Sequence, residues 1–170
     1  MRFPRAPGLP LLIVFCLCAC TAHEPYPAKW EAPVAPKQDC GHITGEYGNT
    51  GGTGSPFASP TLTSLLLETG GERATRVSLS LRRADMVELV AYEKSVPSLS
   101  AILDDVACQR GTLTVRRALW EAEGVAAGPQ DVVIELSTSG EWLIVRVVGG
   151  APGAALGYAP PAGWHRFRRL

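Results

Sequence analysis

Apolar and polar residues alternate along much of the second half of the chain, which predicts a domain built mostly of β-strands. Valine and leucine alternate with serine and arginine over residues 77–82, and a similar alternation runs over residues 87–92. A period of two is typical of a strand with one buried face. Arg83-Ala84-Asp85 separates the two runs and predicts a tight turn, so the two strands are expected to form a hairpin.

The same pattern predicts two further hairpins and two single strands. Arg110-Gly111 and the stretch 138–141 contain the turn residues. The strands expected around them span 107–109 with 113–119, and 132–137 with 142–148; the single strands span 42–47 and 164–169. Arg117 falls on the apolar face of its strand and interrupts that face.

One short helix is expected at residues 60–68, after the glycine-rich loop 48–56. Ser59 is a favourable N-cap, Pro60 suits the first helical position, and Gly70 is a natural stop. Short strands joined by short turns favour an antiparallel meander that curls to bury its apolar face. The predicted fold is mainly β, a small barrel or half-barrel with one short helix; a two-sheet sandwich is the alternative.

The first residues have the order of a secretory signal. Arg2 and Arg5 precede an apolar run at residues 9–19, which is shorter than the roughly 20 residues of a transmembrane helix. Leu17-Cys18-Ala19-Cys20 ends this run and is similar to the lipobox of bacterial lipoproteins. The expectation is a signal peptide at residues 1–19 and lipidation of Cys20; the alternative is an ordinary signal that is cut elsewhere.

Lipidation would attach the rest of the chain to a membrane. Three acyl chains anchor a protein essentially permanently, since one chain alone binds only marginally. Thr21, rather than aspartate, follows the cysteine, and by similarity to lipoprotein sorting this favours the periplasmic leaflet of the outer membrane. Residues 20–39 are proline-rich and predict an extended spacer reaching some 50 to 60 Å. Residues 40–170 are then one β-rich domain.

Charge and cysteine content limit the possible partners and the cellular compartment of the chain. Sixteen basic and sixteen acidic residues balance, so there is no global field to attract nucleic acid. Cys40 and Cys108 are the cysteines left beyond Cys20. In an oxidising compartment they fit a disulfide, the favoured interpretation. Two free buried thiols, or a metal site that also uses His42, are the alternatives, although the spacing lacks the paired Cys-x-x-Cys of a strong zinc motif.

The stretch Cys40-Gly-His-Ile-Thr-Gly-Glu-Tyr47 resembles the opening of the mature domain in small, largely uncharacterised proteobacterial lipoproteins. The resemblance continues at Cys108-Gln-Arg-Gly-Thr-Leu and at Trp164-His-Arg-Phe. It implies a lipoprotein with a β-rich domain and brings no activity with it.

A second, weaker resemblance is to lipocalins, through Gly45-x-Tyr47 in the place of their Gly-x-Trp. That resemblance implies an arginine of the closing strand stacked on the aromatic ring, a role for Arg166 or Arg168. It also implies a barrel that carries a small apolar ligand.

No motif in the sequence predicts catalysis, a cofactor or a resident metal. The glycine run 48–54 lacks the lysine of a phosphate-binding loop, and no Gly-x-Ser-x-Gly elbow occurs. Asp104 and Asp105 are adjacent and read as a solvated turn. Arg166 and Arg168 share one strand face by parity and form, with Trp164, a candidate binding surface; the alternative is a last strand with a solvated face.

The expected function is a non-catalytic binding or structural module of the cell envelope, in contact with the membrane through its anchor and with a protein or envelope partner. A lipocalin-like carrier is the alternative. A hydrolase using His42 or His165 is a remote third.

Overall fold

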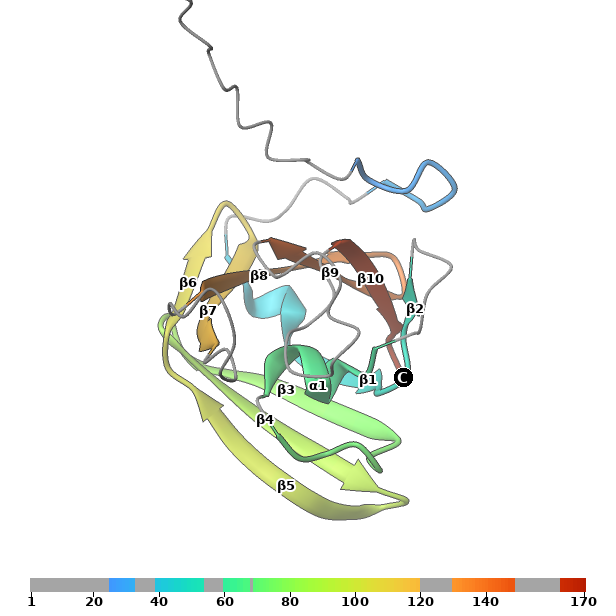
Figure 1. Ribbon diagram of the computed structural model, residues 1–170, viewed down its shortest axis with the longest axis vertical. Helices are drawn as coiled ribbons and strands as arrows, with labels where there is room; N and C mark the ends of the chain where they lie inside the picture. Colours follow the sequence, from blue (N-terminus) through green and yellow to red (C-terminus); the bar gives the residue numbers. More distant parts are fainter. Residues whose placement is uncertain (1–24, 33–38, 54–59, 68, 120–129, 149–162) are drawn as a thin grey trace, which may run out of the picture.

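The computed structural model describes residues 25–32, 39–53, 60–67, 69–119, 130–148 and 163–170. The predicted mainly β fold is confirmed, and the described residues include one short α-helix and one 3-10 turn (Figure 1). The elements are η1 (Gly41–Ile43), β1 (Gly45–Gly48), β2 (Gly52–Thr53), α1 (Leu62–Leu66), β3 (Arg76–Arg83), β4 (Met86–Glu93), β5 (Val96–Leu103), β6 (Val106–Gln109), β7 (Thr112–Leu119), β8 (Gln130–Ser139), β9 (Trp142–Val148) and β10 (Gly163–Arg168).

The strands form two antiparallel sheets. One has the order β1-β3-β4-β5 and the other the order β2-β10-β9-β8-β7-β6. The sheets approach each other where Tyr47 of β1 forms an isolated bridge with Arg169, directly after β10. The chain crosses between them at Asp104–Asp105, both exposed. Among the described residues the two sheets do not close into one barrel, which fits a half-barrel or a sandwich.

The core lies between the two sheets, and α1 is drawn there in Figure 1. Alternation along the strands supplies it: in β4, for example, Val87, Leu89 and Ala91 are buried while the residues between them are half-buried. All three described leucines that α1 contributes, Leu62, Leu65 and Leu66, are buried as well. The burial of one face per strand is the reason that a period of two in the sequence identifies these strands.

The three predicted hairpins are present, with turns at Ala84–Asp85, Arg110–Gly111 and Gly140–Glu141. Arg110 and Gly111 both have positive φ, 51° and 75°. A two-residue hairpin turn with positive φ at both positions matches the right-handed twist of its flanking strands. The second position therefore suits glycine, which adopts this conformation without steric cost.

Strand β5 was not predicted by the sequence, and its residues explain why. Pro97 lies near its start, and the outer side chains Val96 and Ile102 are 67% and 51% exposed. β5 is the edge of its sheet, the position where a strand tolerates proline. The expected first strand at 42–47 is also corrected: a 3-10 turn occupies Gly41–Ile43, and the strand begins at Gly45.

Helix α1 is shorter than predicted, and its cap is a different residue. It covers Leu62–Leu66 rather than 60–68, and Thr61 is the N-cap instead of Ser59, which lies outside the described residues. The Thr61 hydroxyl accepts a hydrogen bond from the Ser64 N–H at 3.1 Å, and the Thr61 N–H donates to the Ser64 hydroxyl, also at 3.1 Å. This reciprocal pair is a capping box in which serine replaces the usual glutamate.

Arg117 interrupts the apolar face of β7 for a structural reason. Its Nη1 donates a hydrogen bond of 2.6 Å to the main-chain carbonyl of Leu65, in the last turn of α1. The last carbonyls of a helix lack partners within the helix, and a cation there also complements the helix dipole. The arginine that breaks the sequence pattern therefore joins β7 to the end of the helix.

Candidate binding surface

Strand β10 places the three predicted surface residues on one face, as the parity of the sequence indicates. Trp164, Arg166 and Arg168 point outward, whereas His165 and Phe167 between them are buried. Across the neighbouring strand β9, the register pairs them with Arg146, Ile144 and Trp142 respectively. Two tryptophans and three arginines therefore lie together on the outer face of the six-stranded sheet.

Arg166 lies at the centre of this surface, between two aromatic rings. Its guanidinium carbon is 4.4 Å from the ring centroid of Trp142 and 4.9 Å from that of Trp30. Arg146 lies similarly over Trp164, at 5.2 Å. Each cation–π contact of this kind contributes about 0.5 to 1 kcal/mol at exposed sites and more where water is excluded.

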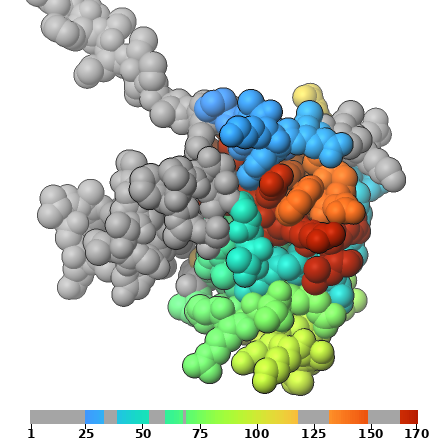
Figure 2. Space-filling view, turned by 90° about the vertical axis from the view of Figure 1, so that its right-hand side faces the viewer, coloured from blue at the N-terminus to red at the C-terminus, as the bar shows by residue number. Residues whose placement is uncertain are grey.

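Trp30 belongs to a segment near the N-terminus, Pro25–Ala32, which we call the docked segment. Figure 2 shows this segment, in blue, lying against the orange and red strands β8, β9 and β10. The ring of Tyr26 meets Trp164 edge-on at 5.0 Å and Trp30 edge-on at 6.0 Å. A turn holds the segment together: the Trp30 N–H donates to the Pro27 carbonyl at 2.9 Å, and the Tyr26 hydroxyl donates to the Glu31 carbonyl at 2.7 Å.

The docked segment is also joined to the β8–β9 hairpin. The hydroxyl of Ser139 lies 3.2 Å from the Glu31 carbonyl and 3.1 Å from the Ala32 carbonyl, and Ser139 is buried. Ile144 points to this outer face, yet it is only 1% exposed and is separate from the main core cluster. The outer face of the six-stranded sheet is therefore covered around Ile144, where a bare strand face would leave this side chain in water.

Carboxylates partner two of the three arginines. Arg146 lies 3.0 Å from Glu135, and Arg168 lies 3.6 Å from Glu141 in an exposed pair of little energetic weight. Arg166 has no such ion pair within the described ranges. Burial raises the pKa of the Tyr26 phenol, an effect that the positive charge of Arg166 opposes.

These contacts correct part of the expected spacer. The sequence predicts an extended spacer over residues 20–39, in which Tyr26 and Trp30 could dock on the domain or on lipid headgroups; the structure places Pro25–Ala32 against the domain. Two aromatic residues in a proline-rich stretch were the available signal. The sequence did not indicate that Trp142 joins this surface. Residues 149–162 separate β9 from β10, and a connection of that length does not determine which residues of the two strands pair.

We expect Trp164→Ala to loosen the docked segment, because the substitution removes the ring that Tyr26 contacts. Trypsin cleavage after Lys29, an exposed residue of the segment, should then become about fivefold faster, as expected for the loss of roughly 1 kcal/mol of aromatic contact. The rate is measured by mass spectrometry of native digests. Tyr92→Ala is the matched control, since it removes a ring in contact with Arg76 on the other sheet. Equal cleavage rates in the two variants would contradict the expected role.

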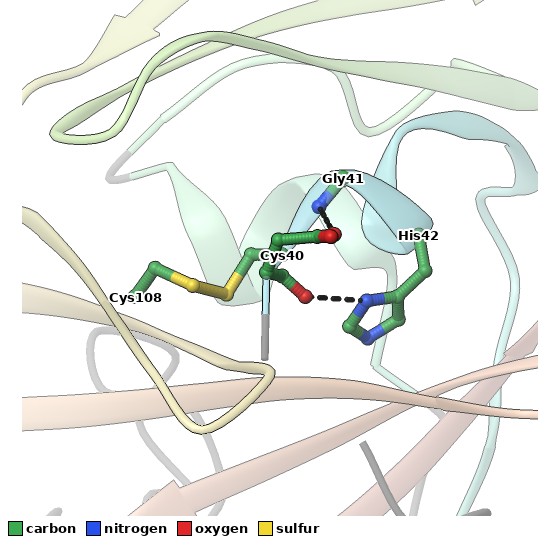
Figure 3. The surroundings of a disulfide bond; sticks show 5 residues. Cys40, Gly41, His42 and Cys108 are labelled. Carbon is green, nitrogen blue, oxygen red and sulfur yellow. Dashed lines mark hydrogen bonds between the residues drawn. A yellow bond between two sulfur atoms is a disulfide. The ribbon is translucent and has the colours of Figure 1, made fainter. Parts of the chain in front are cut away.

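Cys40 and Cys108 come together as predicted. Their sulfur atoms are 2.07 Å apart, at bonding distance, and join η1 to β6 (Figure 3). Sulfurs bonded to each other are unavailable as two thiolate ligands, so the alternative metal site with His42 is not supported. The His42 ring instead turns toward the main chain, with Nδ1 2.9 Å from the Asp39 carbonyl oxygen.

The aromatic ring of the Gly45-x-Tyr47 motif does meet an arginine, but not one of the two predicted. Arg169 lies 5.9 Å from the Tyr47 centroid, while Arg166 and Arg168 are on the outer face. Arg169 Nη2 donates to the Thr44 carbonyl at 2.7 Å. A Cβ on Gly45 would lie 3.0 Å from the Arg169 Nε and Nη2 atoms, so glycine leaves the room that this guanidinium occupies.

We expect Tyr47→Phe to lower the free energy of unfolding by an amount that depends on pH. Its buried hydroxyl donates to the Ile43 carbonyl at 2.7 Å, and burial raises its pKa to about 12, although Arg169 opposes the shift. The pKa of Tyr47 in the folded protein exceeds the unfolded value of 10.0. The hydroxyl therefore stabilises the fold fully below pH 10, and this stabilisation is lost as pH rises through about 12. Tyr47→Phe should cost about 1 kcal/mol at pH 7, a deficit that shrinks above pH 10. Urea unfolding at several pH values measures it; a constant deficit would contradict this account.

Comparison with known proteins found no match to a family model, a curated protein or a solved structure. In the part of the chain that the structure describes, no helix has the length and apolar character needed to cross a membrane. No three histidine, cysteine or acidic side chains gather there in a way that would hold a metal ion. The predicted lipidation site, Cys20, lies outside the described residues.

Proposed function

We propose that this chain is a lipoprotein of the cell envelope, anchored through Cys20 in the outer membrane, whose β-rich domain binds an envelope component without catalysing a reaction. The observation that carries the proposal is the surface around Arg166. It combines three tryptophans with arginine, and such residues are enriched in binding surfaces. Trp30, the residue that completes it, lies only ten positions after Cys20.

The cysteine pair supports a location outside the cytoplasm. Disulfides persist in oxidising compartments such as the periplasm and are rare in the reducing cytoplasm. Cys40 and Cys108 lie at bonding distance, which is compatible with export by the signal proposed for residues 1–19. The lipobox and the cysteine pair are independent features of the sequence, and both favour the same side of the membrane.

The arrangement of His42 favours binding over catalysis. A Cys40–His42 catalytic pair requires a free thiolate, but the sulfur of Cys40 lies at bonding distance from that of Cys108. The His42 Nδ1 atom lies 2.9 Å from the Asp39 carbonyl oxygen, so the imidazole ring is held by its own turn. The inward side chains of both sheets form one buried cluster, and this favours a packed core over the ligand chamber of a lipocalin-like carrier.

Metabolic labelling with a fatty acid tests the anchor. We expect the full chain to incorporate the label and to fractionate with the outer membrane, and Cys20→Ala to lose both properties. Cys18→Ala is the matched control, because it removes the neighbouring cysteine of the same motif and should change neither. Label retained in Cys20→Ala would contradict the proposed site.

Site-specific crosslinking tests the binding surface. A photoreactive amino acid in place of the exposed Arg168 should give a defined crosslinked species in intact cells. The same amino acid in place of Arg83, exposed on the four-stranded sheet, should not. Identical crosslinking from both positions would argue against a specific surface on β10.

A further inference from the structure

Arg166 differs from the other two arginines of its face, because aromatic rings, and no carboxylate of the described residues, surround it. Trp142 and Trp30 lie over it at 4.4 and 4.9 Å. A guanidinium that stacks on rings keeps the N–H groups at its edge directed along its own plane. That edge is suited to bidentate binding of an oxyanion such as a phosphate or a carboxylate.

The position of the docked segment limits how far this surface can lie from a lipid anchor. Five residue steps separate Cys20 from Pro25, where the docked segment begins. A fully extended chain spans at most about 3.6 Å per residue, so these steps reach at most about 18 Å. This is far less than the 50 to 60 Å allowed by a free spacer of twenty residues. An acyl chain on Cys20 would therefore hold the surface around Tyr26 near the lipid headgroups.

We propose that this surface faces the membrane that holds the anchor, and that Arg166 binds the phosphate of a phospholipid headgroup there. The inference rests on the proposed lipidation of Cys20. Tryptophan and tyrosine are the residues that favour the membrane–water interface, and Tyr26, Trp30 and Trp164 gather at this place.

Neighbouring carboxylates leave Arg166 as the arginine of this face that is suited to bind a phosphate. Arg146 and Arg168 are partnered by Glu135 and Glu141, so the surface is not a polybasic patch that would attract any anion at long range. A single arginine with its edge available recognises a phosphate at short range, after the anchor has brought the surface close. The lipid anchor therefore brings the protein to the membrane, and Arg166 binds the headgroup only afterwards.

Depth-dependent fluorescence quenching of the lipidated full chain in phosphatidylglycerol vesicles tests this inference. A Trp120→Phe background leaves the three tryptophans of the surface as reporters. Lipids brominated near the headgroup should quench them more strongly than lipids brominated near the chain ends. Arg166→Gln should lower the ratio of quenched to unquenched protein about fivefold, as expected for one arginine near an anionic surface. Arg83→Gln, on the other sheet, should leave it unchanged.

The variants distinguish phosphate binding from a purely structural role. Arg166→Lys keeps the charge but lacks the planar, bidentate edge, so its quenching should lie between that of the wild type and that of Arg166→Gln. Wild-type quenching in both variants would overturn the phosphate contact. Inorganic phosphate added at millimolar concentration should not reverse the quenching, and reversal would assign the site to free phosphate instead. Acylated protein without headgroup quenching would overturn this inference alone. Protein without an acyl group would overturn the proposed function, and with it the tether on which the inference rests.

Discussion

Replacing Asn49 with alanine is expected to lower the free energy of unfolding by about 4 kcal/mol, because two buried main-chain groups, the Ala74 carbonyl and the Thr63 N–H, lose their partner at once. Asn49 is fully buried. Its side-chain amide donates to the carbonyls of Gly71 and Ala74, at 3.1 and 2.9 Å, and its side-chain oxygen accepts from the Thr63 N–H at 3.0 Å. Each such group costs about 1 to 3 kcal/mol when it is buried without a partner.

The main chain of Asn49 also contacts α1, through bonds that the alanine variant retains. Its carbonyl accepts from the Leu62 N–H at 2.8 Å, and its own N–H donates to the Thr75 carbonyl at 3.0 Å. The first N–H groups of a helix have no partner within the helix. Asn49 therefore satisfies two of the first N–H groups of α1 from a distant part of the chain, which matters because a helix of five residues is not stable alone.

Urea unfolding at pH 7 measures the effect, with Thr69→Ala as a control for an exposed side chain of the same region. Asn49→Asp separates the lost hydrogen bonds from the lost volume. It keeps the size and the acceptor, but a carboxylate faces the two carbonyl oxygens and destabilises the fold. Protonation restores one donor, so this variant should regain stability as pH falls toward about 4. A loss below 1 kcal/mol for Asn49→Ala would contradict the proposed role.

The strands with one buried face were predictable from the sequence, whereas the edge strand β5 and the two-residue β2 were not. In β3 and β4 every second side chain enters the core, and the alternation is visible without any structure. In β5 the outer residues Val96 and Ile102 are apolar, so the two faces look alike in the sequence. Arg117 was correctly placed on the apolar face, but its partner, the Leu65 carbonyl, lies 52 positions away.

The candidate surface was predictable only in part, for a related reason. Parity alone places Trp164, Arg166 and Arg168 together, because it is a property of one strand. The contacts of Arg166 with Trp30 and Trp142 join three distant segments. Such contacts depend on the register between β9 and β10 and on the turn at Pro27, and neither is encoded by a local pattern.

Loss of the Cys40–Cys108 bond is the second change with a large expected effect. The two cysteines are 68 positions apart, and closing a loop of that length contributes about 4 kcal/mol in the chain-entropy model. We expect Cys40→Ala combined with Cys108→Ala to lower the free energy of unfolding by at least this amount. Cys40 is buried, so the double variant also loses the packing of a sulfur atom.

The reduced wild-type chain is the matched control for that experiment, because it retains both sulfur atoms and lacks only the bond. A deficit shared by the reduced chain and the double variant is due to the crosslink, and any excess in the double variant is due to packing. Equal unfolding midpoints of the oxidised and reduced chains in urea would contradict the prediction.

The place of this bond in the fold is the reason to expect a global effect. Turn η1 contacts β3 of one sheet and β8 of the other, and Cys40 precedes it directly. Cys108 lies on β6, the outermost strand of the six-stranded sheet. The sheets are also joined at the bridge between Tyr47 and Arg169. Without the bond, that bridge and core packing must hold the two sheets together, so we expect cooperative unfolding of the domain at lower urea concentration instead of local fraying of β6.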